Sequence, residues 1–225
     1  MTKHLLLALP LLLGQVAFSQ AASLQAQLAD RNGAPLPNAV ITLKGPATGA
    51  STPGKAVMDQ REMRFVPSVL AIRAGTAVSF PNNDDIRHHV YSFSEPKRFE
   101  LRLYQGTPSD PVVFDKPGLV VLGCNIHDWM VGYIYVSEDP WFAVSDAQGK
   151  VTFDNLPAGD YSVTLWHSLL PNMQPQSSTA LKVTDAGVQQ RFELPVDAPA
   201  ESEPPGAPPS AFGDAFKKAL EHGSH

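Results

Sequence analysis

The sequence LVVLGCNIHDWMVGYIYV, residues 119–136, contains two apolar segments around one short loop. The LVVL and VGYIYV segments are rich in β-branched and aromatic residues, which favours strands. The loop between them carries Cys124, His127 and Met130, which offer a thiol, an imidazole and a thioether. Soft sulfur ligands combined with imidazole select copper among first-row metals. The stretch therefore predicts a metal-binding loop between two strands.

A trigonal copper site with two imidazoles, one thiolate and a weak axial thioether needs a second histidine from elsewhere in the chain. Residues 80–90 (FPNNDDIRHHV) offer the adjacent pair His88 and His89 after a polar loop. Because successive side chains of a strand point to opposite faces, only one of the pair faces the site. We favour His88 and keep His89 as the alternative. The Asn82–Arg87 loop before them is expected to supply hydrogen bonds that tune the site.

Each of these residues has a simpler interpretation. Cys124 fits a small buried hydrophobic residue, and Met130 fits a gap-filling core residue. Trp129 is interpreted as packing, or as part of an apolar rim around the exposed edge of His127. Asp128 is interpreted as a solvated charge.

The rest of the chain has the pattern of an all-β protein. Short segments rich in Val, Ile, Phe and Tyr recur over residues 22–44, 57–136 and 141–194, separated by Gly, Pro, Asn and Asp. Strands end at tight connections predicted at 146–149 and 155–159. No stretch of these segments shows sustained helical spacing.

The N-terminus has the pattern of a secretory signal peptide. Lys3 precedes the apolar run Leu5–Leu13, which is shorter than the roughly 20 residues of a membrane span. Small residues favour cleavage after Ser19 or Ala21. We therefore expect residues 1–19 to be removed, and the mature protein to lie in the periplasm without a membrane span. An uncleaved N-terminal anchor is the alternative.

The composition narrows the function. The chain has 225 residues, 43% of them hydrophobic, with a net charge of −5 and one cysteine. A single cysteine excludes a disulfide within the chain and every metal site with several cysteines. The acidic balance gives no basic surface for nucleic acid, so we expect no nucleic-acid partner.

Residues 55–137 resemble a cupredoxin, the family of plastocyanin and amicyanin. The resemblance rests on the Cys-x-x-His-x-x-Met loop and on the upstream pattern Gly75-x-x-Val78-x-Phe80-x-Asn82 followed by His88-x-Val90. It implies a Greek-key β-sandwich that holds one type 1 (blue) copper ion through His88, Cys124, His127 and Met130. Within that family, the chain is similar to the periplasmic proteins called methylamine-utilisation proteins.

The flanking segments resemble a carboxypeptidase-regulatory or transthyretin-like β-sandwich. The motif GKVTFDNLPAGDY at 149–161 carries this resemblance. We predict one such sandwich from residues 22–54 and 138–196, with the cupredoxin domain inserted between its parts or flanked by it. His167 lies in this part and is expected to be structural. Residues 197–225 read as a Pro-rich linker and C-terminal tail.

These features predict a periplasmic blue copper protein that transfers single electrons, with a c-type cytochrome or a periplasmic oxidoreductase as partner. The alternative is a copper-binding protein for resistance, storage or delivery, without redox turnover. A third hypothesis is an interaction module in which the cupredoxin is structural. The ligand set leaves no open coordination position, so we expect no enzyme.

Overall fold

The computed structural model describes residues 22–46, 53–108, 110–178 and 180–198. Over these residues the chain forms β-strands, one 3₁₀ turn, η1 (Pro171–Met173), and connecting loops, which confirms the prediction of an all-β chain. The predicted signal peptide at 1–19 lies outside the described residues, as does the tail beyond residue 198. In the described ranges there is no helix with the length and apolar character needed to cross a membrane.

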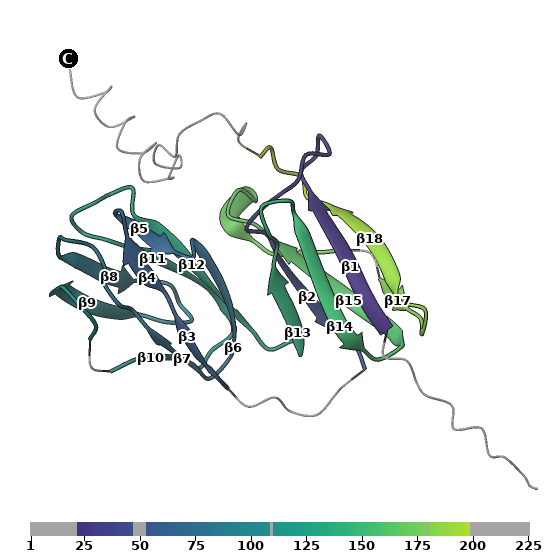
Figure 1. Cartoon of the computed structure of the whole chain (residues 1–225), viewed down its shortest axis with the longest axis horizontal. Coiled ribbons are helices and arrows are strands. Elements are labelled where there is room, and N and C mark those ends of the chain that lie inside the picture. The colour runs from purple at the N-terminus through teal and green to yellow at the C-terminus, as the bar shows by residue number, and fades with distance from the viewer. Residues whose placement is uncertain (1–21, 47–52, 109, 179, 199–225) are drawn as a thin grey trace, which may run out of the picture.

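The strands gather in two lobes that lie side by side (Figure 1). One lobe contains β3 (Lys55–Val57), β4 (Asp59–Arg61), β5 (Arg64–Val66), β6 (Val69–Arg73), β7 (Thr76–Ser79), β8 (His88–Ser92), β9 (Phe99–Tyr104), β10 (Val112–Phe114), β11 (Gly118–Gly123) and β12 (Val131–Ser137). The other contains β1 (Ala22–Ala29), β2 (Val40–Lys44), β13 (Trp141–Val144), β14 (Lys150–Leu156), β15 (Gly159–Trp166), β16 (Gln176–Ser177), β17 (Leu181–Val183) and β18 (Val188–Glu193). We call them the β3–β12 lobe and the β1–β18 lobe.

The β3–β12 lobe is a sandwich of a five-stranded sheet, in the order β6-β12-β11-β8-β9, and a three-stranded sheet, β10-β7-β3, with the β4–β5 hairpin beside them. Val90, Val120 and Ile134 project inward from the larger sheet. Val78 and Phe114 meet them from the smaller one. All five side chains are fully shielded from solvent, so this buried layer holds the two sheets together.

The β1–β18 lobe is a second sandwich. Its sheets have the orders β14-β1-β18 and β13-β2-β15-β16, and β17 also pairs with β15. Leu24 and Leu28 of β1 pack into one core with Ile41 of β2 and Val163 of β15. The N-terminal strands β1 and β2 thus pair with strands that follow β12, so the β3–β12 lobe lies between them in the sequence.

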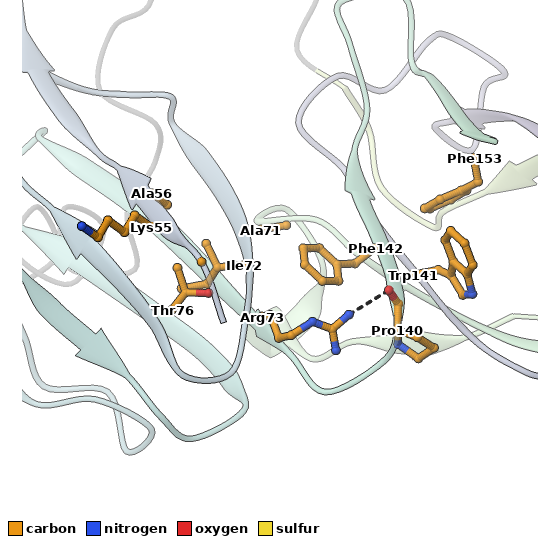
Figure 2. Close-up of a pocket in the computed structure, with 11 residues that line it drawn as sticks. Lys55, Ala56, Ala71, Ile72, Arg73, Thr76, Pro140, Trp141, Phe142 and Phe153 are labelled. Atoms are coloured by element: carbon orange, nitrogen blue, oxygen red, sulfur yellow. Dashed lines mark hydrogen bonds between the residues drawn. The ribbon is translucent and has the colours of Figure 1, made fainter. Parts of the chain in front are cut away.

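The two lobes also touch between β6 and β13. Nη2 of Arg73 donates a 2.9 Å hydrogen bond to the Pro140 carbonyl oxygen, and its guanidinium lies 5.6 Å from the ring centre of Phe142. Figure 2 shows these side chains in a cleft of about 370 Å³ between the lobes. The side chain of Arg73 therefore joins β6 of one lobe to β13, and to the residue just before it, in the other lobe.

The strand predictions fail mainly at short polar or irregular segments. The strand at Gln176–Ser177 was missed because it has two exposed polar residues and no apolar pattern. The connection predicted at 155–159 is shorter, since β14 continues to Leu156. Asn155 continues that strand with φ 60°, a conformation that asparagine tolerates better than most residues.

Candidate metal centre

The loop that joins β11 to β12 carries three of the predicted ligands. Cys124 directly follows β11, and Met130 directly precedes β12. Gly123 pairs with Val131, so the antiparallel ladder closes beneath the loop and holds its two ends side by side. The N–H of Met130 donates to the carbonyl oxygen of His127 at 2.9 Å, which closes a turn within the loop.

The fourth predicted ligand lies on β8, next to β11 in the same sheet. Nδ1 of His88 is 3.9 Å from Sγ of Cys124, and Nδ1 of His127 is 3.8 Å from the same sulfur. One donor atom from each residue lies within 4.8 Å of the other two. Two imidazoles and a thiol therefore converge, although His88 and Cys124 are 36 residues apart in the chain.

Most of the candidate centre is shielded from water. His88 is 0% exposed and Cys124 3% exposed. Met130, 1% exposed, belongs to the same buried hydrophobic cluster as Cys124. His127 is only half-buried, and its ring centre lies 5.3 Å from that of Trp129, which is 48% exposed. One edge of the site therefore reaches the surface, next to an exposed tryptophan.

The surroundings of His127 favour the neutral form of its imidazole. Burial lowers its pKa, the nearby His88 lowers it further, and the carboxylate of Asp84 opposes both effects. A neutral imidazole can donate a lone pair to a metal, whereas a protonated one cannot. The electrostatics of the group thus favour metal binding.

An acidic residue that sequence reasoning did not single out contacts the site. Oδ2 of Asp84 lies 2.6 Å from Nε2 of His88. Burial raises the pKa of Asp84, but hydrogen bonds from the N–H groups of Met63 and Glu62 and from His88 outweigh it, so that pKa is lowered overall. Asp84 and His88 are four residues apart. That spacing predicts a contact in a helix but not in a loop, so the sequence did not indicate this pair.

A buried asparagine fixes the loop that leads to His88. Nδ2 of Asn82 donates to the carbonyl oxygens of Ile86 and Tyr104, each at 2.9 Å. Its Oδ1 accepts the N–H of Asp84 at 3.0 Å. Asn82 is 2% exposed, so these partners replace water for its polar atoms. The prediction that this loop supplies hydrogen bonds around the site agrees with these contacts.

The structure brings His88, and not its neighbour His89, to Cys124. His89 lies with Nε2 3.1 Å from Oε1 of Glu100, at ion-pair distance but without hydrogen-bond geometry. Its ring packs edge-on against Tyr91, with centres 5.7 Å apart. His89 therefore faces away from the group of three.

Two further residues lie where the sequence placed them. Asp128 is exposed, in line with a solvated charge. His167 lies in the β1–β18 lobe, where Nε2 is 3.2 Å from the Pro37 carbonyl oxygen and Nδ1 accepts the N–H of Leu169 at 3.1 Å. Both of its ring nitrogens are engaged by backbone, as in a structural histidine.

The donor set fits copper. A thiolate and two imidazoles suit copper or zinc, and the thioether of Met130, in the same buried cluster as Cys124, favours copper. Two of the donor residues are buried, and the third, His127, is half-buried. The group of His88, Cys124 and His127 therefore suggests a copper site.

No family model and no curated protein matches the chain. Among solved structures it is similar to a copper-containing nitrite reductase from Thermus scotoductus SA-01, with 29% identity, 42% of this chain and 25% of that chain covered, and a TM-score of 0.35. It is also similar to a purple cupredoxin from Nitrosopumilus maritimus, with 24% identity and a TM-score of 0.32. That match covers 36% of this chain and 96% of the purple cupredoxin. An oxidised mutant of amicyanin is similar as well, with 16% identity and a TM-score of 0.34. That match covers 43% of this chain and 99% of the amicyanin. The match thus spans a quarter of the nitrite reductase and nearly all of the two small proteins.

Proposed function

We propose that the chain is a type 1 copper protein of the cupredoxin kind that carries single electrons in the periplasm. Its ligands would be His88, Cys124, His127 and Met130. The observation that carries the proposal is the convergence of one nitrogen from each of two imidazoles and one thiol sulfur, all within 4.8 Å of one another. When bound, copper supplies a one-electron redox couple.

The role of the protein is to hold the four ligands in one arrangement. Cys124 and Met130 sit at the two ends of a loop closed by the β11–β12 ladder, and His88 begins the neighbouring strand β8. A site held by sheets and hydrogen bonds is preorganised, so its ligands need to move little when the charge at the centre changes. Burial of His88 and Cys124 also limits the water that must reorient.

The half-buried His127 offers the route to a partner. It is the most exposed of the four ligands, and Trp129 and Ile126 beside it are 48% and 49% exposed. Such a surface favours contact with another protein through apolar area. We propose a c-type cytochrome or a periplasmic oxidoreductase as that partner.

The remaining assignments belong to the same proposal. Four ligands fill a type 1 site, which leaves no position for a substrate, so we propose a carrier and not an enzyme. The apolar run within residues 1–19 supports export. The two-sheet β1–β18 lobe, with the inserted β3–β12 lobe, supports a transthyretin-like sandwich around a cupredoxin domain.

Spectroscopy of the mature protein loaded with Cu(II) tests the proposal. We expect an intense visible absorption from the thiolate–copper bond, an EPR spectrum with a narrow copper hyperfine splitting, and reversible bleaching by ascorbate. A colourless copper complex with an ordinary EPR spectrum would refute the type 1 assignment.

A second experiment separates electron transfer from copper handling. The reduced protein is mixed with an oxidised c-type cytochrome. In a parallel experiment it is mixed with a copper-accepting protein that carries no copper at the start. Electron transfer predicts fast reduction of the cytochrome, with copper retained on this chain. A slow redox reaction with transfer of copper to the acceptor would instead support storage or delivery.

A further inference from the structure

The buried ligand His88 has a carboxylate on its far side. Its Nδ1 faces Sγ of Cys124 at 3.9 Å, and its Nε2 lies 2.6 Å from Oδ2 of Asp84. The His88 side chain is 0% exposed and that of Asp84 13% exposed. Water therefore has little access to the contact between the two residues.

Asp84 is itself held in place by the turn of the β4–β5 hairpin. Oδ1 accepts the N–H of Glu62, and Oδ2 accepts the N–H of Met63 at 2.9 Å. Glu62 and Met63 have φ values of 50° and 56°, a turn conformation that aims two successive N–H groups at the carboxylate. The N–H of Asp84 is bound in turn to Oδ1 of Asn82 at 3.0 Å. The orientation of the carboxylate is thus set by backbone groups outside the ligand loop.

The chemistry of this contact selects which ring nitrogen carries an N–H. An ionised carboxylate only accepts hydrogen bonds, so Nε2 of His88 is the donor in its contact with Asp84. Nδ1, on the side of Cys124, is then the ring nitrogen available to a metal. A ligand histidine whose second nitrogen donates to a carboxylate is both oriented and made more basic.

We propose that Asp84 is a positioning residue for the metal site: it fixes His88 in the Nδ1-ligating tautomer, and its negative charge favours Cu(II) over Cu(I). The inference rests on the proposed copper function. The charge of Asp84 acts through the buried ring of His88, where solvent screens it less than at the surface. The β4–β5 hairpin, which supplies no ligand, is thereby part of the machinery that sets the reduction potential.

Three variants test the assignment. D84N keeps an acceptor for Nε2 but removes the charge, D84A removes both, and D85N is the control. Asp85 is exposed and adjacent in sequence, so D85N makes the same change of net charge away from His88. The readouts are the ¹⁵N chemical shifts of His88 in the metal-free protein, Cu(I) and Cu(II) affinities by chelator competition, and the reduction potential.

We expect a single Nε2–H tautomer of His88 in the wild type and in D84N, and a mixture in D84A. For D84N we expect the ratio of Cu(II) to Cu(I) affinity to fall about tenfold, which raises a one-electron potential by about 59 mV. For D84A we expect metal affinity to fall about 10- to 100-fold. D85N should match the wild type in all three readouts.

Two results would overturn the assignment. One is an Nδ1–H tautomer in the metal-free wild type, which needs no variant to fold. The other is a D84N potential equal to that of D85N. Failure of the proposed function has a different signature, because a wild type without the thiolate–copper absorption would still show the His88 tautomer and its dependence on Asp84.

Discussion

The ring centre of Tyr133 on β12 lies 5.5 Å from that of Trp166 on β15. Tyr135, two residues further along β12, meets the same tryptophan at 6.0 Å. Alternate residues share one face of a strand, so this face of β12 packs on the β1–β18 lobe. The opposite face, which includes Ile134, belongs to the core beneath Cys124. One strand thus links the candidate metal centre to the second lobe.

Removal of this contact should destabilise the protein. Trp166 is 0% exposed, and truncation of a buried tryptophan to alanine costs about 3–5 kcal/mol through lost contacts and the cavity left behind. We expect Trp166→Ala to lower the free energy of unfolding by this amount, measured by urea titration with circular dichroism. Trp129→Ala, at an exposed tryptophan, should change it by less than about 0.5 kcal/mol. Equal losses in the two variants would contradict the assigned packing.

The thiol of Cys124 should be required for the copper absorption. In the proposed copper site, Cys124→Ser would remove the thiolate–copper bond, so we expect the intense visible band to vanish. The serine hydroxyl enters a buried position, with a cost of about 1–3 kcal/mol, so circular dichroism should still report the sandwich. Met130→Leu, which would remove the proposed thioether ligand, should retain the band and change the EPR spectrum. A persistent band in Cys124→Ser would show that another residue ligates the metal.

The exposed tryptophan beside His127 should affect the partner more than the metal. Trp129→Ala removes apolar surface next to the half-buried ligand, so we expect slower electron exchange with a c-type cytochrome and an unchanged Cu(II) affinity. Stopped-flow reduction and chelator competition measure the two quantities. Phe93→Ala is the matched control, since Phe93 is 77% exposed and follows β8 at the end away from His88. Equal rates for the two variants would argue against a docking role of Trp129.

The loop before His88 should depend on Asn82. Asn82→Ala removes the buried donor of two part-buried hydrogen bonds, to the carbonyl oxygens of Ile86 and Tyr104. A buried polar group that loses its partner costs about 1–3 kcal/mol, so we expect a loss of stability in this range in urea. Asn83→Ala, next to it but exposed, should cost less despite the hydrogen bonds of its amide to Asp59. A larger loss in Asn83→Ala would reverse the assigned roles.

Stability should fall in mild acid because of His167. Burial lowers the pKa of His167 below its ordinary value of 6.5, although the hydrogen bond to Pro37 partly opposes this. As the pH falls below 6.5, the unfolded chain binds a proton that the folded chain does not, so the free energy of unfolding decreases. The decrease ends once the pH passes the lowered pKa of the folded state. Urea titrations from pH 7.5 to 5 should show this slope in the wild type and a smaller one in His167→Gln; identical slopes would contradict it.

Much of the fold could be predicted from local pattern. The strands at Val112–Phe114 and Trp141–Val144 agree with the structure, because β-branched and aromatic residues stand between clear turn signals. The Cys-x-x-His-x-x-Met spacing likewise marked Cys124, His127 and Met130 as one loop, since three chemically distinct donors occur within seven residues. The short polar strand β16 gave no such signal and was missed.

The all-β class and the placement of three donors on one loop follow from neighbouring residues, so the amino-acid pattern was enough to predict both. The contact of His88 with Cys124, the carboxylate of Asp84 behind His88, and the packing of β12 on Trp166 emerge only in the folded chain. These contacts join residues on different loops and strands. Their distances depend on how the strands are ordered within the sheets and how the two sandwiches pack, and a linear pattern does not encode either.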